Sequence, residues 1–207
     1  ELDARLNMLT DLSGKVAIVT AGPTYEAIDP VRFIGDHSSG LMGIELANAL
    51  ASRGAKTVLV LGPTSLKIPP GIELVCVTTA IEMYEAVKER FISTDIAVMA
   101  AAVADYRPLN RASNKIKKTQ TELSITLTKN PDILQFCGEH KTINQLVVGF
   151  ALETDNEEGN AKEKMHRKNA DMIVLNSLNT PQAGFGTLTN KLTIFEQSGI
   201  VHDVPLD

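Results

Sequence analysis

The run from Asp95 to Val103 constrains the fold most, because it is apolar almost without interruption after its first residue. A strand with one face in water alternates apolar and polar side chains, whereas a strand buried on both faces reads as a continuous apolar run. Continuous burial of this kind is typical of a central strand in a parallel sheet. The run therefore predicts a sheet whose two faces are both covered by other elements.

Shorter apolar runs and helical patterns alternate along the rest of the chain. Further strands are predicted at residues 15–20, 57–61, 72–77, 145–152 and 172–176, and helices at 39–53, 81–91, 132–137 and 157–169. Strands separated by helices of about a dozen residues favour parallel pairing through right-handed crossovers. The predicted fold is α/β: a Rossmann-like, doubly wound, mainly parallel sheet with helices on both faces.

The remaining segments are less regular. Residues 106–120 are polar and basic without a period, which predicts a mobile flap, and a short strand is expected at 123–127. The runs 187–195 and 200–204 are separated by Gln197-Ser198-Gly199, so a C-terminal β-hairpin is predicted. No linker divides the chain. Residues 1–14 are predicted to be a lead-in segment and residues 15–207 a single domain.

Composition narrows the function classes. The chain has 207 residues, of which 43% are hydrophobic and 22% charged, as in ordinary globular domains. A net charge of −5 and the lack of a membrane-length apolar run argue against nucleic-acid and membrane partners. Cys76 and Cys137 are predicted to be buried free thiols, which favours a reducing, cytoplasmic location. Because the sequence begins at Glu1 rather than Met, we expect it to be excised from a longer chain.

A run of small, hydrogen-bonding residues, Gly35 to Gly43, precedes the predicted helix 39–53. Free N–H groups and the positive end of the helix dipole converge at such a helix start, so the run suits a bound anion. A polar, non-helical stretch separates the run from the first strand. Long stretches of this kind in α/β units more often hold a ligand than merely connect elements.

Ligands of open α/β sheets bind beyond the carboxyl ends of the strands. The residues expected there are Gly22-Pro23-Thr24, Gly62-Pro63, Ala101 to Asp105, Phe150 to Thr154 and Asn176. The alanines before Asp105 let a ligand approach the backbone, and this carboxylate, which we expect to be buried, could accept hydrogen bonds from a base or ribose or hold a cation. A helix cap or turn residue is the alternative interpretation of Asp105.

Three basic or capping motifs are weaker signals. The run Lys115-Ile116-Lys117-Lys118 in the flap could bring positive charge over a phosphate, although basic runs are usually solvated. The segment Asn130 to Ile133 has a capping Asn and a Pro suited to a first helical turn. Lys164 and Lys168 lie four residues apart and could reach one polyphosphate, although a solvent-facing pair is commoner.

No cluster of His and Cys has metal-ligand spacing, and no serine nucleophile motif or P-loop is present. His37 is the one histidine placed to take part, because it lies in the glycine-rich run. The chemistry is therefore expected to consist of positioning and electrostatics.

Taken together and in order, these segments resemble the bacterial phosphopantothenate–cysteine ligases, usually the C-terminal half of a bifunctional coenzyme A biosynthesis protein. The resemblance spans residues 15 to 206 and is carried by Thr20-Ala21-Gly22-Pro23-Thr24, Asp29-Pro30-Val31-Arg32, His37-Ser38-Ser39-Gly40, Met42-Gly43, Ala101 to Tyr106, Lys115 to Lys118, Lys129 to Ile133, Val148-Gly149-Phe150, Glu153-Thr154 and Lys168-Asn169.

The resemblance implies a reaction in two steps within a nucleotide-binding ligase domain, residues 15–207. CTP activates the carboxylate of 4′-phosphopantothenate to an acyl-cytidylate with release of pyrophosphate. The amine of L-cysteine then displaces CMP to form the amide. Mg²⁺ accompanies the triphosphate, members are homodimers, and the flavin-containing decarboxylase domain that usually precedes the ligase is absent from this sequence, so no flavin is expected.

The resemblance also assigns roles to residues. The nucleotide would be bound by Gly22, Pro23, Thr24, Ser38, Ser39, Gly40, Ala101, Asp105, Lys115, Asn130, Pro131, Asp132, Ile133, Phe150, Lys164 and Lys168. Phosphates would be cradled by backbone N–H groups of residues 22–24 and 38–40, and the flap residue Lys115 would stabilise their charge. Arg32, Asp36 and Ala102 would contact the acyl substrate, Arg32 as a bidentate donor to its phosphate, from the same or the partner subunit.

Asp36 departs from the family pattern, which has asparagine at this position. An amide donates to a phosphoryl oxygen, whereas an ionised carboxylate only accepts hydrogen bonds and repels negative charge. The family links this residue to amide formation. We therefore expect activation by CTP to survive and the amide-forming step to be impaired, so that the intermediate accumulates. The substitution is isosteric, and the fold should be unchanged.

Two other functions fit the sequence less well. A nicotinamide-dependent reductase needs a Gly-x-Gly-x-x-Gly turn after the first strand and an acidic residue after the second, and Gly22-Pro23-Thr24 and Gly62-Pro63-Thr64 supply neither. A non-catalytic nucleotide-binding regulator on the same fold is favoured by Asp36 and disfavoured by the flap lysines. The residues themselves do not distinguish CTP from ATP, and they do not locate a cysteine pocket.

Overall fold

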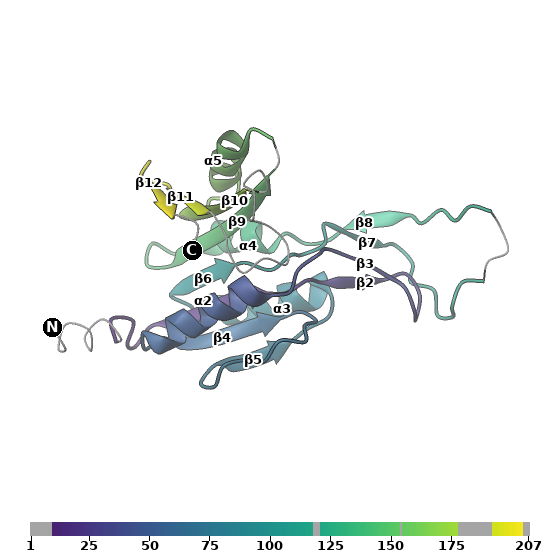
Figure 1. The fold of residues 1–207 in the computed structure, drawn as a ribbon, viewed down its shortest axis with the longest axis horizontal. Helices are drawn as coiled ribbons and strands as arrows, with labels where there is room; N and C mark the ends of the chain where they lie inside the picture. Colours follow the sequence, from purple (N-terminus) through teal and green to yellow (C-terminus); the bar gives the residue numbers. More distant parts are fainter. Residues whose placement is uncertain (1–9, 118–120, 154, 178–191, 205–207) are drawn as a thin grey trace.

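The computed structural model describes residues 10–117, 121–153, 155–177 and 192–204, and Figure 1 shows their arrangement. The helices are α2 (Leu41–Ser52), α3 (Ala80–Phe91), α4 (Ile133–His140) and α5 (Glu157–Arg167). The strands are β1 (Val16–Ala21), β2 (Tyr25–Ala27), β3 (Phe33–Gly35), β4 (Lys56–Leu61), β5 (Glu73–Cys76), β6 (Ile96–Met99), β7 (Tyr106–Pro108), β8 (Leu127–Lys129), β9 (Leu146–Glu153), β10 (Met172–Ser177), β11 (Leu192–Glu196) and β12 (Val201–Val204).

Eight strands form one sheet in the order β12-β11-β10-β9-β6-β1-β4-β5. Strands β5, β4, β1, β6, β9 and β10 are parallel to one another. The predicted central strand is confirmed, because β6 pairs with β1 on one side and with β9 on the other. It is shorter than expected, since the chain leaves the ladder after Met99 and Ala102 forms an isolated bridge to Pro23 instead.

Helices cover both faces of the sheet, as predicted. On one face, α2 packs Ile44 and Ala47 against Val19 and Leu59. On the other face, α3, α4 and α5 bury a larger core around Ile18, Val147 and Ile173; the helical residues in it are Met83, Val87 and Phe91, then Ile133, Leu134 and Cys137, then Ala161 and Met165. Each buried Leu, Ile, Met or Phe side chain contributes about 1.5–3 kcal/mol to the hydrophobic driving force.

Two short hairpins, β2–β3 and β7–β8, form an arm that extends away from the sheet (Figure 1). Strand β2 contacts β7, and the rings of Tyr25 and Phe33 stack with their centroids 3.9 Å apart. The sequence did not predict β2 and β3. The strand expected at 123–127 was also placed wrongly, because pairing with β7 begins only at Leu127 and continues to Lys129.

The two ends of the chain and its two cysteines agree with the sequence predictions only in part. The part of the lead-in that is described, residues 10–14, forms turns. The C-terminal hairpin is confirmed as β11 and β12, although residues 187–191 of the expected first strand lie outside the described residues. Cys137 is buried, and burial raises the pKa of its thiol to about 12. Cys76 is exposed at the end of β5, so the prediction of two buried thiols was wrong for this residue.

Candidate functional site

A cleft of about 180 Å³ opens where β1, β6 and β9 reach their carboxyl ends. The predicted site residues that line it come from four separate segments: Ala101, Asp105, Asn130, Pro131, Asp132, Ile133, Phe150, Lys164 and Lys168. Carboxyl-end clefts are the usual ligand sites of open α/β sheets. The cleft is therefore the candidate functional site.

The N-terminus of α4 forms one wall of the cleft. Asp132 is the N-cap, and its Oδ1 accepts from the Gln135 N–H at 2.8 Å. Its Oδ2 accepts from Lys168 Nζ at 2.6 Å. Burial would raise the pKa of the Asp132 carboxyl, but the hydrogen bonds from Lys168 and Gln135 outweigh burial and hold the pKa below its ordinary value. The helix dipole adds positive potential at this wall, which favours a bound anion.

Two lysines of α5 and the turn after it also line the cleft. Lys164 Nζ donates to the carbonyl oxygen of Phe150 at 2.7 Å. Lys168, only 9% exposed, donates to Asp132 and to Gln135 Oε1 at 3.1 Å. Gly138 brings Lys168 to this place, because α4 approaches the backbone at Lys168 so closely that a Cβ on Gly138 would lie 1.8 Å from the Lys168 carbonyl oxygen. The two ammonium groups can thus reach one ligand in the cleft.

Asn130 ties the edge of the cleft together instead of capping a helix. Its Nδ2 donates to Ala104 O at 2.7 Å, its Oδ1 accepts from Arg107 Nη1 at 3.0 Å, and its N–H donates to Asp105 O at 2.8 Å. The expectation that Asn130 is the N-cap was therefore wrong. Its bonds fix the chain after β6 against the chain that enters α4.

Residues Gly22 to Thr24 are buried behind the cleft and do not line it. The Thr24 N–H donates to Ala102 O at 3.1 Å, and the Ala102 N–H donates to Gly22 O at 2.9 Å. Thr24 Oγ1 accepts from the Ala104 N–H at 3.0 Å. The expected phosphate cradle was therefore wrong for Thr24, whose N–H is engaged, and for Pro23, which has none. Ala102 likewise serves this backbone bridge and does not line the cleft.

The run 36–40 leads from β3 into α2. Asp36 is exposed in it. Gly40, the N-cap of α2, has φ 83° and lies against Gly22, where a Cβ on Gly40 would be 3.2 Å from Gly22 Cα. Ser38 Oγ accepts from the Gly40 N–H at 3.2 Å, and Ser39 Oγ accepts from the Leu41 N–H at 3.3 Å. The run thus lies at the carboxyl edge of the sheet, beside β1.

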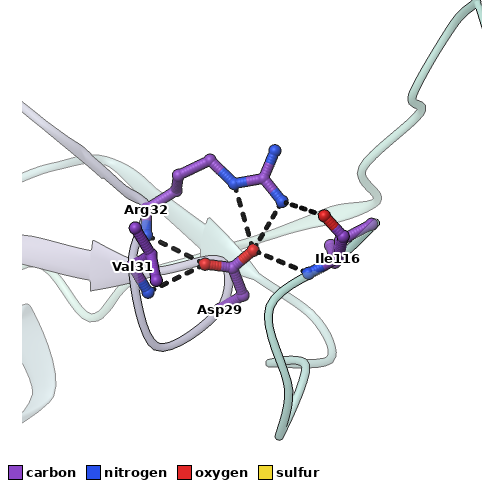
Figure 2. A network of polar contacts seen from close by, with 4 residues as sticks. All are labelled: Asp29, Val31, Arg32 and Ile116. Atoms are coloured by element: carbon purple, nitrogen blue, oxygen red, sulfur yellow. Dashed lines mark hydrogen bonds and ion pairs between the residues drawn. The ribbon is translucent and has the colours of Figure 1, made fainter. Parts of the chain in front are cut away.

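Lys115 and Arg32 lie on the arm and do not line the cleft. Lys115 is exposed in the chain between β7 and β8, and Lys118 is outside the described residues. Arg32 Nε and Nη2 donate to Asp29 Oδ2 at 3.0 and 2.5 Å, and Nη2 also donates to Ile116 O at 3.2 Å (Figure 2). Asp29 thus occupies the donor pair of Arg32 that was expected to bind a phosphate, while Nη1 points away from both partners.

Asp105 is exposed at the mouth of the cleft, so the expectation of a buried carboxylate was wrong. No group of three or more His, Cys, Asp or Glu residues with metal-binding geometry occurs in the described ranges. Mg²⁺ typically uses one or two carboxylates plus substrate phosphates, so the donor set fits an ion that enters with a polyphosphate. No helix within the described ranges is long and apolar enough to cross a bilayer.

Some cleft residues were not singled out from the sequence. Thr20, Met99 and Leu134 also line the cleft. Thr20 Oγ1 accepts from the Ala101 N–H at 3.2 Å, which bends the chain after β6 toward β1. These residues occur in runs that otherwise predict core strands and helices, and no pattern within the runs distinguishes them.

Fold and cleft together define a Rossmann-like α/β domain with a cleft at the carboxyl edge of its sheet, lined by two lysines and the N-terminus of a helix. The sequence matches the family described as the C-terminal domain of DNA/pantothenate metabolism flavoproteins over residues 12–207. The chain belongs to this family.

Three relatives illustrate the similarity. The "Coenzyme A biosynthesis bifunctional protein CoaBC" of Vibrio parahaemolyticus is 46% identical over 190 residues, which is 91% of this chain and 48% of the relative. A "Cysteine/Cysteine sulfinic acid decarboxylase" from an unknown prokaryotic organism is 52% identical over 188 residues, covering 90% of this chain and 52% of the relative. The chain thus spans about half the length of the curated relatives it matches.

The third relative is a solved structure, the crystal structure of the C-terminal domain of a CoaBC protein. It superposes with a TM-score of 0.78 at 39% identity and covers 93% of this chain and 87% of its own. The doubly wound fold is therefore shared with a solved member of the family.

Proposed function

We propose that this chain is a phosphopantothenate–cysteine ligase domain of coenzyme A biosynthesis, and that it uses CTP. The convergence of Asp132, Lys164, Lys168 and the start of α4 on one cleft carries the proposal, because this set suits the phosphates of a nucleotide. The names of the full-length CoaBC relatives agree with it.

The reaction would proceed in two displacements. A carboxylate oxygen of 4′-phosphopantothenate attacks the α-phosphorus of CTP, and pyrophosphate leaves. The amine of L-cysteine then attacks the acyl carbon, CMP leaves, and the surplus proton passes to solvent. Lys164 and Lys168 would bind the polyphosphate, and Lys115 would stabilise its developing charge. A magnesium ion bound to the triphosphate would neutralise part of its charge, with Asp105 as the carboxylate at the mouth of the cleft.

A homodimer is part of the proposal. The arm carries large apolar side chains that are 42–60% exposed: Val31, Phe33, Tyr106, Leu109, Leu123 and Leu127. Apolar surface gathered on a projecting element is typical of a protein interface. A second copy of the chain packed on this arm would bury these side chains. It could also bring Nη1 of the partner's Arg32 to the phosphate of the acyl substrate bound in the first copy. We also propose a reducing, cytoplasmic location, which the two unbridged cysteines support.

We propose that Asp36 allows the activation step and slows the amide-forming step. Its carboxylate would repel the acyl phosphate, whereas the amide found in the family would donate to it. In this chain the acyl-cytidylate should therefore accumulate. Because Asp36 is exposed, Asp36→Asn should leave stability within about 0.5 kcal/mol of the original.

A single-turnover assay tests these steps. The chain is mixed with CTP, Mg²⁺ and 4′-phosphopantothenate, and pyrophosphate is measured; L-cysteine is then added, and the amide is measured. We expect pyrophosphate without rapid amide formation, and Asp36→Asn should restore amide formation by tenfold or more, about 1.4 kcal/mol of barrier. Nucleotide binding without pyrophosphate would favour the regulator, and rapid amide formation by the original chain would contradict the role of Asp36. Replacing CTP with ATP tests the choice of base.

A further inference from the structure

The carboxylate of Asp29 joins the β2–β3 hairpin of the arm to the flap, the segment 106–120 that includes β7. Asp29 lies between β2 and β3, and its side chain is fully buried. Its Oδ1 accepts from the N–H groups of Val31 and Arg32 at 2.8 and 2.9 Å, which closes a local turn. Its Oδ2 accepts from the Arg32 guanidinium and from the Ile116 N–H at 3.1 Å (Figure 2). One oxygen thus serves the local turn, and the other serves a segment 87 residues away.

The flap backbone is held on both sides of Lys115. The Ala112 N–H donates to Ile28 O at 2.9 Å. Both backbone polar groups of Ile116 are engaged, the N–H by Asp29 and the carbonyl by Arg32 Nη2. Lys115 lies between these two anchors and adjoins the second. Its backbone is therefore fixed by the hairpin, although its side chain is exposed.

We propose that Asp29 is a positioning residue for Lys115. Asp29 does not line the cleft. It holds Arg32 and Ile116 together, and this clamp fixes the direction in which Lys115 leaves the flap. The inference rests on the proposed function of Lys115. It adds that Asp29 is the residue that fixes the position of Lys115. Misplacing a charged group by about 1 Å can lower a rate by ~10²-fold, so the clamp should affect the rate of activation.

The variant Asp29→Asn separates the two uses of the carboxylate. The amide oxygen can still accept from the N–H groups of Val31 and Arg32, so the turn is retained. The amide nitrogen would then face three donors, those of Arg32 and the Ile116 N–H, and cannot accept from any of them. A matched control is Asp95→Asn, at the residue immediately before β6. Asp95 also accepts from a backbone N–H, that of Val16 at 2.8 Å, and from a cation, Lys15 at 3.0 Å, but it makes no contact with the arm.

The first measurement does not depend on activity. The peptide N–H of the bond between Lys115 and Ile116 is the one that Asp29 holds, so trypsin should cleave after Lys115 only when this contact opens, and the cleavage rate reports the population of open flap. We expect Asp29→Asn to raise the rate of cleavage after Lys115 about tenfold, because the loss of a hydrogen bond to a charged group costs roughly 1.5 kcal/mol or more. Asp95→Asn should not change it. Equal rates in Asp29→Asn and the original chain would overturn the clamp.

The second measurement is single-turnover pyrophosphate release at saturating CTP and 4′-phosphopantothenate. Asp29→Asn should slow the rate about 10- to 100-fold while the CTP concentration for half-maximal rate changes less than about twofold. In a Lys115→Ala background the same change should add no further loss, because a positioning residue has nothing left to position. Additive losses, or a loss confined to CTP affinity, would overturn the proposal. If the original chain releases no pyrophosphate, the proposed function fails, and the trypsin result alone decides whether the clamp exists.

Discussion

The contact between Gly138 and the turn after α5 gives a quantitative prediction for Gly138→Ala. In a helix, alanine is favoured over glycine by about 1 kcal/mol. At Gly138 the added Cβ would lie 1.8 Å from Lys168 O and 3.0 Å from Asn169 O, and contacts below 3.0 Å are essentially never seen. The Lys168 carbonyl would have to retreat by about 1.2 Å, and overpacking of this kind costs ~1–3 kcal/mol or more.

A backbone atom at 1.8 Å cannot move aside as a side chain can, so the cost belongs at the upper end of this range, about 3 kcal/mol. After the gain of about 1 kcal/mol in helix propensity, we expect Gly138→Ala to destabilise the chain by about 2 kcal/mol, which lowers Tm by about 4–8 °C. The same shift moves Lys168 away from Asp132, so CTP affinity should fall with stability. Gly159→Ala in α5 is the matched control. There the three atoms nearest to the added Cβ all belong to the side-chain amide of Asn156, which makes no cap hydrogen bond and can rotate away.

Urea denaturation and calorimetric CTP titration of both variants test this reasoning. Gly159→Ala should be at least as stable as the original chain and bind CTP equally well. If Gly138→Ala were as stable as Gly159→Ala, or lost stability without losing CTP affinity, the close packing of α4 on the Lys168 turn would not be what places this lysine.

Three further outcomes are expected. Asp132→Ala removes the N-cap of α4 and should cost about 1–2 kcal/mol in urea denaturation, whereas Asp132→Asn, which keeps a cap acceptor, should lose less. An aromatic disulfide reagent should titrate one thiol, Cys76, in the native chain at pH 8 and a second, Cys137, only after denaturation, because burial raises the pKa of Cys137 to about 12; two native thiols would contradict this. The Arg32 guanidinium holds the pKa of Asp29 well below its usual range, so the unfolded chain binds the extra proton as pH falls below about 5. The stability that this carboxylate contributes is therefore present at neutral pH and lost on acidification, and Asp29→Asn should flatten the dependence of unfolding free energy on pH between about 5 and 2.

The sheet could be predicted from sequence because its strands are buried. Continuous apolar runs identified β1, β4, β6, β9 and β10, and the alternation with helices gave their parallel pairing. The arm could not be predicted in this way. Strands β2, β3 and β7 have three residues each, too few for a period, and they form because Tyr25 stacks on Phe33 and β2 contacts β7. These are contacts across the chain that no local pattern records.

The candidate site, too, could be predicted from the sequence only in part. The rule that ligands bind at the carboxyl ends of strands was enough to select Ala101, Asp105 and Phe150 before their contacts were known. It failed for Thr24, because its N–H is used by the backbone of Ala102. Asp29 was named only as part of the segment Asp29 to Arg32 that carries the family resemblance. Its contact with the flap could not be predicted, because Ile116 approaches it through the tertiary fold.

The clamp at Asp29 also has a consequence for how the molecule opens. Three amide protons, those of Val31, Arg32 and Ile116, end on the same carboxylate. They should therefore exchange with deuterium as a single group, at one rate, even though two belong to the hairpin and one to the flap. The flap amide would then report local breathing of the hairpin, and the two segments would constitute one cooperative unit.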